Sequence, residues 1–300
     1  MAITAEKRKM LGDYLSSSTK FHGEFKYPEE CYPFADLATQ ETIELEEDGY
    51  PFKIYVFTAK NRAANCPVHI NIHGGGFVCR HQINDSLWSA WLADQLQGVV
   101  VDVDYTLSDV APWPVCLDQC RKVARYVYAN CEAMDLDPKR ISIGGYSAGG
   151  VLAVACAMAA VVNHECPYCM IIDGYGPTDM TIPADFRFEG EYWKTPEGRN
   201  VAFSELLFEG DFDRCKDPMF SPLFAEDEIL KQLPHTVICA GGACPFRFQD
   251  QELGMRLASL GVEVSMKTFP GAAHGFIVHF MDGWKEAAEM IVRNLKSASL

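Results

Sequence analysis

Long apolar segments are missing from this sequence of 300 residues, and none reaches the roughly 20 residues that a membrane-spanning helix needs. Basic residues are scarce, because 26 Lys and Arg stand against 41 Asp and Glu, for a formal net charge of −15. This charge argues against nucleic acid or an anionic membrane surface as a partner. Met1 to Tyr14 lacks the apolar core of a signal peptide, so we predict a cytoplasmic protein.

Cysteine, in contrast, is abundant, with twelve residues. Without an export signal, free thiols are favoured over a disulfide framework. Cys166 and Cys169 form a CxxC pair, but a strand-like run follows where a redox motif would begin a helix, which favours an accidental pair. Cys116 and Cys120 lie one helical turn apart without further Cys or His nearby, which favours packing over metal binding. We predict no metal and no cofactor.

Short apolar runs alternate with helical segments along most of the chain. Expected strands cover residues 42–45, 52–56, 68–72, 99–103, 141–143, 170–172, 236–239 and 262–267. Expected helices cover residues 86–97, 114–134, 148–162, 249–260 and 283–295. Alternating strands and helices predict an α/β fold, with a mostly parallel sheet of about eight strands and helices on both faces.

Two regions interrupt this alternation. Residues 1–38 combine a helical start with a crowded aromatic stretch, and residues 181–228 carry many aromatic and acidic residues without a clear strand. An insertion of this length in a compact domain is usually functional. We predict that both regions form a small helical lid over a core made of residues 39–180 and 229–300; the alternative is a packed surface extension.

Ser147 is the predicted nucleophile. It lies in Gly145-Tyr146-Ser147-Ala148-Gly149, between an expected strand and the helix that begins at Ala148. A sharp turn at this junction projects the serine hydroxyl above the sheet, and small neighbours let the strand and the helix approach each other.

The glycine run His73-Gly74-Gly75-Gly76 directly follows the expected strand at residues 68–72. Glycines allow backbone N–H groups to face a substrate without a side chain in the way. We therefore predict an oxyanion hole made by the N–H groups of Gly75, Gly76 and Ala148, with His73 and Gly74 supporting the loop.

His274 is the predicted general base, because it lies in a glycine-rich loop between the last expected strand and the last helix. The acid that orients such a histidine should lie in residues 240–245, but this loop contains Cys244 and no carboxylate. Three interpretations stay open. A carboxylate from elsewhere replaces it, Asp173 first and Asp250 second; Ser147 and His274 work as a dyad at a reduced rate; or hydrolysis is lost and the site only binds a ligand.

In this order, the motifs resemble the hormone-sensitive-lipase-like group of α/β-hydrolases over roughly residues 40–298. Further matches are Asp104-Tyr105-Thr106-Leu107, Leu136-Asp137-Pro138-Lys139-Arg140 and Asp217-Pro218-Met219-Phe220-Ser221-Pro222-Leu223. The sequence departs from the group at Tyr146, where Asp is common, at Thr106, where Arg is usual, and at Cys244, where the group has Asp.

The resemblance implies an α/β-hydrolase fold with a lid and hydrolysis of a small-molecule carboxylic ester through an acyl-serine intermediate, without a cofactor. We expect short-chain acyl esters as substrates. The alternative is a catalytically weakened or inactive pseudo-hydrolase that binds a small ligand, because Cys244 holds the acid position. Many members of the group dimerise through the sheet edge near the last strand, so the resemblance also allows a homodimer.

Overall fold

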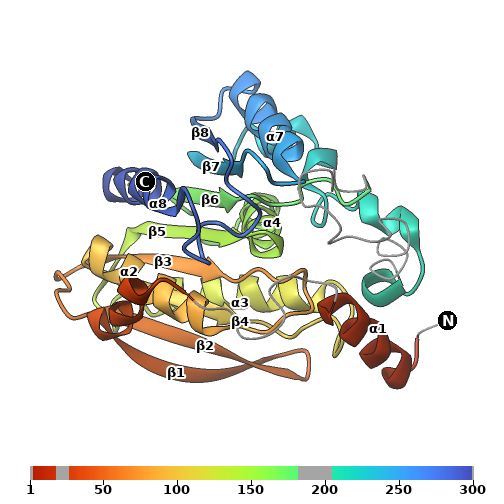
Figure 1. The fold of residues 1–300 in the computed structure, drawn as a ribbon, viewed down its shortest axis with the longest axis horizontal. Helices are drawn as coiled ribbons and strands as arrows, with labels where there is room; N and C mark the ends of the chain where they lie inside the picture. The colour runs from red at the N-terminus through yellow and green to blue at the C-terminus, as the bar shows by residue number, and fades with distance from the viewer. Residues whose placement is uncertain (1–2, 18–26, 182–204, 299–300) are drawn as a thin grey trace.

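The computed structural model describes residues 3–17, 27–181 and 205–298. Their centre is an eight-stranded sheet with the order β1-β2-β4-β3-β5-β6-β7-β8 (Figure 1). β1 and β2 are antiparallel to each other, β2 is antiparallel to β4, and the remaining neighbours are parallel. The strands are β1 (Ala38–Glu47), β2 (Tyr50–Ala59), β3 (Cys66–Ile72), β4 (Val99–Asp104), β5 (Leu136–Tyr146), β6 (Met170–Gly174), β7 (Thr236–Gly241) and β8 (Val264–Phe269).

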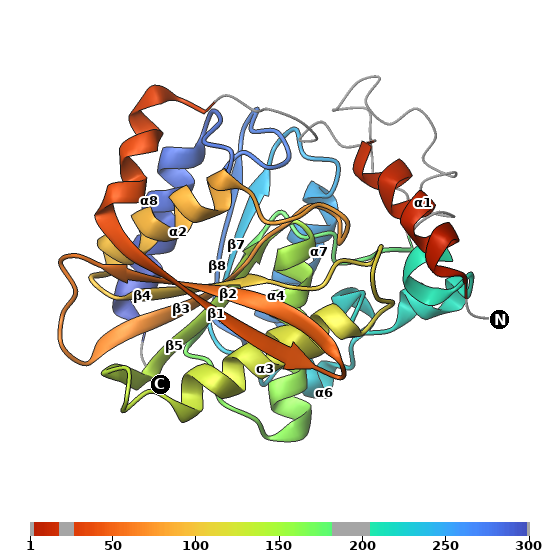
Figure 2. The same ribbon diagram turned by 90° about the horizontal axis from the view of Figure 1, so that it is seen from below.

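Helices cover both faces of this sheet (Figure 2). The α-helices are α1 (Ala5–Ser17), α2 (Ile83–Leu96), α3 (Val115–Ala129), α4 (Ala148–Asn163), α6 (Asp227–Leu230), α7 (Arg247–Ser259) and α8 (Trp284–Ser297), and the 3₁₀ helices are η1 (Glu29–Leu37), η4 (Phe212–Lys216) and η5 (Pro222–Phe224). α2 and α8 lie on one face, and α3, α4 and α7 lie on the other (Figure 2).

The central strands are apolar because both of their faces are buried. Every residue of β3 and β6 is buried. Successive residues point to opposite faces: Ile171 packs in the core beneath α3 and α4, whereas Ile172 packs in the core beneath α2 and α8. The predicted parallel sheet with helices on both faces is therefore confirmed.

The ends of several strands and helices differ from the predicted ones. They differ where a pairing strand or a helix cap fixes the end. β1 and β2 pair along their whole length, from Ala38 opposite Ala59 to Glu47 opposite Tyr50, so both are longer than predicted. β5 begins at Leu136 because that residue pairs with Cys66 of β3. α3 ends at Ala129, five residues early, where the side chain of Asn130 bonds to Tyr126 O.

The two predicted lid regions meet in the structure, in part. Arg8 of α1 is buried and donates to Leu206 O at 2.6 Å and to Ser108 O at 3.1 Å, and Lys7 forms an ion pair with Glu205. Figure 2 shows α1 beside this segment. η1, in the other part of the N-terminal region, packs against α2. Residues 182–204, which make up most of the first half of the predicted lid insertion, lie outside the described residues, so the lid stays a prediction.

All twelve cysteines are described; all are buried and none forms a disulfide. Burial raises the pKa of Cys166 and of Cys169 to about 11. Cys169 lies directly before β6, in agreement with the predicted strand after the CxxC pair. Cys166 and Cys169 are therefore packing residues.

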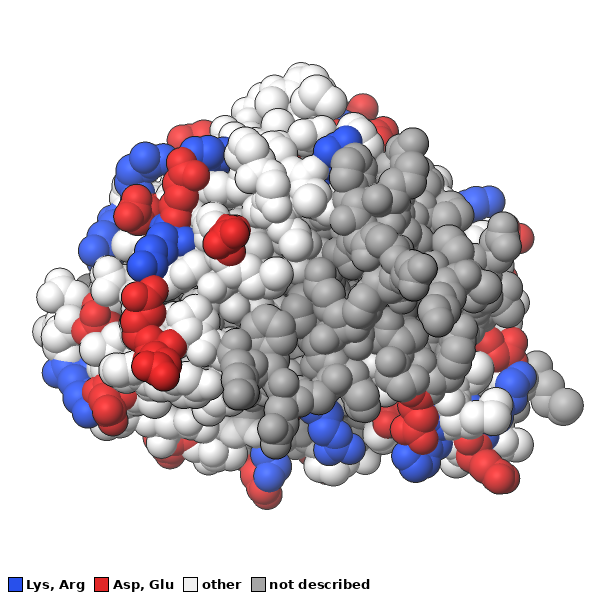
Figure 3. Space-filling view, in the orientation of Figure 1, with Lys and Arg blue, Asp and Glu red and all other residues white. Residues whose placement is uncertain are grey.

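Both signs of charge mix on the face drawn in Figure 3, as at the left of the view, where Figure 1 places α8. Ion pairs there join Lys285 to Glu30 and Lys267 to Glu286. No helix within residues 3–17, 27–181 and 205–298 is long and apolar enough to cross a membrane.

Candidate active site

Ser147 occupies the tight turn between β5 and α4, at the carboxyl end of a central strand. Its backbone has φ 56° and ψ −121°, a strained conformation for a residue with a side chain. A hydrogen bond from Ser147 N to Gly174 O, 2.8 Å long, ties the turn to β6. The side chain is partly exposed. This geometry is that of a serine held out at the top of a sheet as a nucleophile.

His274 reaches Ser147 from the loop that follows β8. Its Nε2 lies 2.9 Å from Ser147 Oγ, although 127 positions separate the two residues in the sequence. The rings of Tyr175 and Phe246 flank the imidazole edge-on, with centroids at 5.1 and 5.2 Å. The imidazole is therefore fixed within proton-transfer distance of the serine hydroxyl.

Cys244 lies on the other side of this imidazole, in the loop after β7. Its Sγ is 3.2 Å from His274 Nδ1, and Phe246 N donates to the same sulfur at 3.4 Å. The residue is fully buried and lies just before the first turn of α7. The sulfur thus accepts from a backbone N–H beside the N-terminus of α7.

The glycine loop lies directly against the nucleophile turn. A methyl group on Gly74 would lie 2.6 Å from Tyr146 O and 3.3 Å from Ser147 Cβ, so only glycine fits there. Gly75 and Gly76 have φ of +98° and +60°. Val78 N and Cys79 N both donate to Gly75 O, which closes the loop into a turn. Ala148 begins α4, and the first N–H groups of a helix have no partner within it. Gly74 therefore lies against the nucleophile turn, Gly75 and Gly76 follow it in the same loop, and Ala148 directly follows Ser147.

A family described by its alpha/beta hydrolase fold matches residues 69–278, which include the glycine loop, Ser147, Cys244 and His274. The chain belongs to the α/β-hydrolase family. The predicted resemblance to its hormone-sensitive-lipase-like group and the predicted fold are confirmed.

Several relatives of this α/β-hydrolase are named as esterases. The versiconal hemiacetal acetate esterase of Dothistroma septosporum is 26% identical over 257 residues, 81% of this chain and 75% of that protein. An arylesterase of Saccharolobus solfataricus is 24% identical over 236 residues, 78% of this chain and 75% of that protein. The solved structure of an esterase from Pyrobaculum calidifontis has a TM-score of 0.81 at 22% identity, over 99% of this chain and 95% of that chain, and shares the fold.

The two carboxylates proposed as replacement acids interact with each other and not with His274. They are Asp173 and Asp250. Both are fully buried, and Asp173 Oδ1 accepts from Gly176 N at 3.1 Å. Burial raises the pKa of Asp173 to about 7, and burial together with the Asp173 charge raises that of Asp250. Burial thus favours the uncharged form of both carboxyl groups, and a neutral acid orients an imidazole poorly. The structure places Cys244, not Asp173, beside His274 Nδ1.

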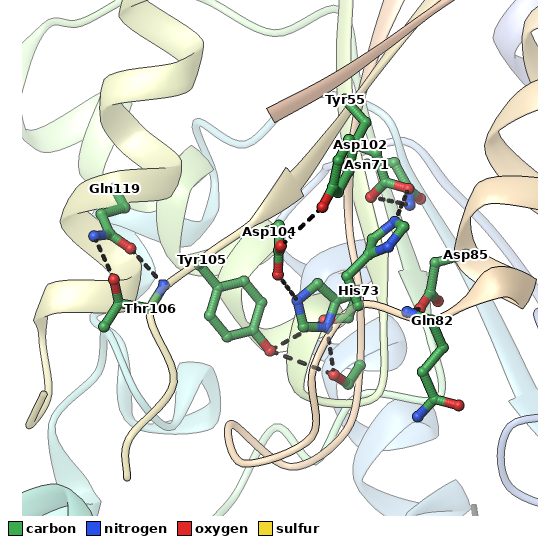
Figure 4. A network of polar contacts seen from close by, with 12 residues as sticks. Tyr55, Asn71, His73, Gln82, Asp85, Asp102, Asp104, Tyr105, Thr106 and Gln119 are labelled. Carbon is green, nitrogen blue, oxygen red and sulfur yellow. Dashed lines mark hydrogen bonds and ion pairs between the residues drawn. The ribbon is translucent and has the colours of Figure 1, made fainter. Parts of the chain in front are cut away.

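His73 lies at the start of the glycine loop and contacts its backbone. Its ring stacks on Tyr105 with centroids 4.3 Å apart, and its Nδ1 lies 2.8 Å from Gly74 O (Figure 4). Tyr105 Oη donates to His73 O at 3.2 Å and to Gly74 O at 3.4 Å. The resemblance to the family includes Tyr105 but assigns it no role. In the structure Tyr105 holds the backbone at the start of the glycine loop.

Sequence reasoning missed the residues at the other end of the glycine loop. His81 Nε2 lies 3.0 Å from Asp102 Oδ2, inside the core of this α/β-hydrolase. One signal was available, since Asp102 is an acidic residue in the middle of the apolar run Val99–Val103. A charge buried in a central strand requires a partner.

Proposed function

We propose that this α/β-hydrolase is a serine esterase that hydrolyses carboxylic esters of small molecules through an acyl-serine intermediate. The observation that carries the proposal is the 2.9 Å contact between Ser147 Oγ and His274 Nε2 on the nucleophile turn. The esterase relatives support the same reaction.

In the first half of the reaction, Ser147 Oγ attacks the ester carbonyl while His274 Nε2 takes its proton. The N–H groups of Gly75, Gly76 and Ala148 stabilise the oxyanion; one such donor is typically worth about 3 kcal/mol of transition-state stabilisation. The imidazolium then gives its proton to the leaving alkoxide. In the second half, His274 activates water to cleave the acyl-serine.

Cys244 takes the orienting role that a carboxylate has in related enzymes. For Nε2 to accept the serine proton, Nδ1 must carry hydrogen and donate toward Cys244 Sγ. That contact fixes the tautomer, and a thiolate at this place would also stabilise the imidazolium. The 3.2 Å sulfur contact supports this role over an acid supplied by Asp173 or a dyad without a third member.

Short acyl groups are the substrates that the described residues favour. Phe77, directly after the glycine loop, packs on Trp113 and Phe220, and Phe208 closes the same cluster. All four rings are buried. Two of them, Phe208 and Phe220, come from the predicted lid insertion. One relative is an esterase of a hemiacetal acetate, which agrees with a small acyl group. Faster turnover of decanoyl than of acetyl esters would refute this preference.

The pseudo-hydrolase alternative is not favoured, because the named relatives are esterases and because His274 contacts the Ser147 hydroxyl. The deciding experiment compares hydrolysis of p-nitrophenyl acetate by the wild type and by Ser147→Ala, together with labelling by a fluorophosphonate probe. We expect turnover and labelling that both disappear in the variant. Equal background rates in both proteins would remove ester hydrolysis and support ligand binding. The cytoplasmic location and the homodimer stay predictions.

A further inference from the structure

A buried group of charges lies beneath the far end of the glycine loop. Asp102 lies in the middle of β4 with a side chain that is 0% exposed. Its two oxygens accept three hydrogen bonds, from Asn71 Nδ2 at 3.0 Å (Figure 4), from Ser89 Oγ at 2.8 Å and from His81 Nε2 at 3.0 Å. These donors come from β3, from α2 and from the loop between them, so one carboxylate joins three elements.

His81 is the charged partner of this carboxylate. Burial alone would lower its pKa, but the neighbouring Asp102, with its hydrogen bond, and the charges of Asp85 and Asp104 raise the pKa to about 9. The side chain is only 7% exposed. A buried carboxylate with an imidazolium partner is an ion pair whose disruption leaves an uncompensated charge in the core.

Titratable groups face His81 from every element around it. Tyr55 of β2 lies against the ring with centroids 4.7 Å apart, and its Oη donates to Asp104 at 3.2 Å. His73 of the glycine loop meets the ring edge-on at 5.8 Å. Asp85 of α2 accepts from Gln82 N at 2.8 Å, which caps the helix directly after His81. His81 is therefore fixed both to the core and to the start of α2.

The glycine loop thus has two fixed ends. Tyr105 and His73 hold its beginning, and His81 holds its end, two residues after Cys79, whose N–H closes the turn on Gly75 O. The N–H groups of Gly75 and Gly76 lie between these two anchors. Donors of an oxyanion hole act through their fixed direction, so a loop held at one end only would lose part of their effect.

We infer that His81 and Asp102 are positioning residues of the esterase: their ion pair fixes the end of the glycine loop and so aligns the oxyanion donors. This inference rests on the proposed function. Neither residue touches the reacting atoms. The ion pair exists only while His81 is charged; neutral His81 can keep the hydrogen bond but not the charge, so alignment is strongest at neutral pH and weakens as pH rises through the value at which His81 releases its proton.

The test uses kcat and KM for p-nitrophenyl acetate between pH 6 and pH 10.5. The neutral double variant His81→Gln/Asp102→Asn removes both charges and keeps two amides able to bond. We expect kcat at pH 7 to fall by about 10- to 100-fold with little change in KM. The wild type should lose kcat near pH 9, whereas the double variant should not show this step.

Two further variants separate charge from folding. His81→Lys keeps a cation beside Asp102 whose ordinary pKa is higher, so the alkaline loss should move upward. His235→Gln is the matched control. His235 Nδ1 also lies near a carboxylate, at 3.6 Å from Glu263 Oε1, but it precedes β7, whereas Cys244 of the candidate site follows that strand. This variant should keep the wild-type rate and pH profile. Circular dichroism confirms that each variant is folded.

An unchanged kcat in the folded double variant would overturn the inference, as would an alkaline step that stays near pH 9 in folded His81→Lys. Both results leave the proposed function intact, because the wild type turns over substrate. A wild type without turnover would instead overturn the proposed function, and with it the role of His81.

Discussion

Replacing Cys244 by aspartate should make this esterase faster. The thiol sulfur is one bond from Cβ and is a weak acceptor, and it lies 3.2 Å from His274 Nδ1. A carboxylate oxygen is two bonds from Cβ and reaches further toward the imidazole, where a charge-assisted hydrogen bond of roughly 2.7–2.9 Å can form. Phe246 N, which now donates to the sulfur, would bond the second carboxylate oxygen.

The size of the gain follows from the kind of hydrogen bond. A neutral hydrogen bond contributes about 0.5–1.5 kcal/mol and one to a charged group about 1.5–3 kcal/mol. The carboxylate should therefore stabilise the transition state by about 1–2 kcal/mol more than a thiol does, which corresponds to about 5- to 30-fold in kcat. In a serine protease, exchange of the acid for its amide cost about 10⁴ in kcat, and this sets an upper bound.

The assay measures kcat for p-nitrophenyl acetate in the wild type, Cys244→Asp, Cys244→Asn and Cys244→Ala. Asparagine has the reach of aspartate without its charge, so it separates the two effects and should not exceed the wild type. Alanine removes the acceptor and should be slower than the wild type. A folded Cys244→Asp with the melting temperature and the kcat of the wild type would show that His274 is not oriented from position 244.

Three further predictions follow from other contacts. Because burial holds Asp173 protonated up to about pH 7 while the unfolded chain ionises near pH 4, the unfolding free energy should fall as pH rises from about 4 to 7. Asp173→Asn should weaken this fall in urea denaturation at pH 5 and pH 8; an equal fall in both proteins would contradict the assignment. Tyr105→Phe removes the two hydrogen bonds to the glycine loop, so it should lower kcat by about 3- to 10-fold with KM nearly unchanged. A raised KM at constant kcat would argue against a role of Tyr105 in holding this loop. Arg8→Ala removes the donor of two buried carbonyls, of Leu206 and Ser108, so it should lower the unfolding free energy by about 1–3 kcal/mol in urea denaturation and speed proteolysis of α1. Unchanged proteolysis would show that other contacts hold α1.

Much of the sheet and two members of the site were predictable because their signals are local. The run Ile141–Ile143, the glycines around Ser147 and the following helix all act on one turn, so the nucleophile can be recognised without tertiary information. His274 follows for a similar reason, since the order of strands places its loop at the same sheet edge. The ends of β1 and β5 depend instead on partners in other strands, which the local pattern does not contain.

The acid position shows where sequence reasoning ended. Asp173 ends an apolar run near the nucleophile, and sequence distance alone makes it a plausible acid. In the structure its Oδ1 lies 2.4 Å from where a methyl group on Gly150 of α4 would be, and Asp250 is its electrostatic neighbour. Successive side chains of a strand point to opposite faces of the sheet, so a shift by one position decides on which face a carboxyl group lies. The ion pair of His81 and Asp102 joins a loop to a strand 21 positions away and has no local signal beyond one buried charge.

The twelve buried thiols can report local unfolding of this molecule. They are spread from Cys31 in η1 to Cys244 beside the catalytic histidine, and all are shielded from solvent in the folded state. A thiol reagent can modify each one only when its surroundings open, so the rate at each site measures a local opening free energy. Mass spectrometry of the partly modified protein would map these rates. The same experiment would show whether the loop that carries Cys244 opens on its own or only when the whole sheet unfolds.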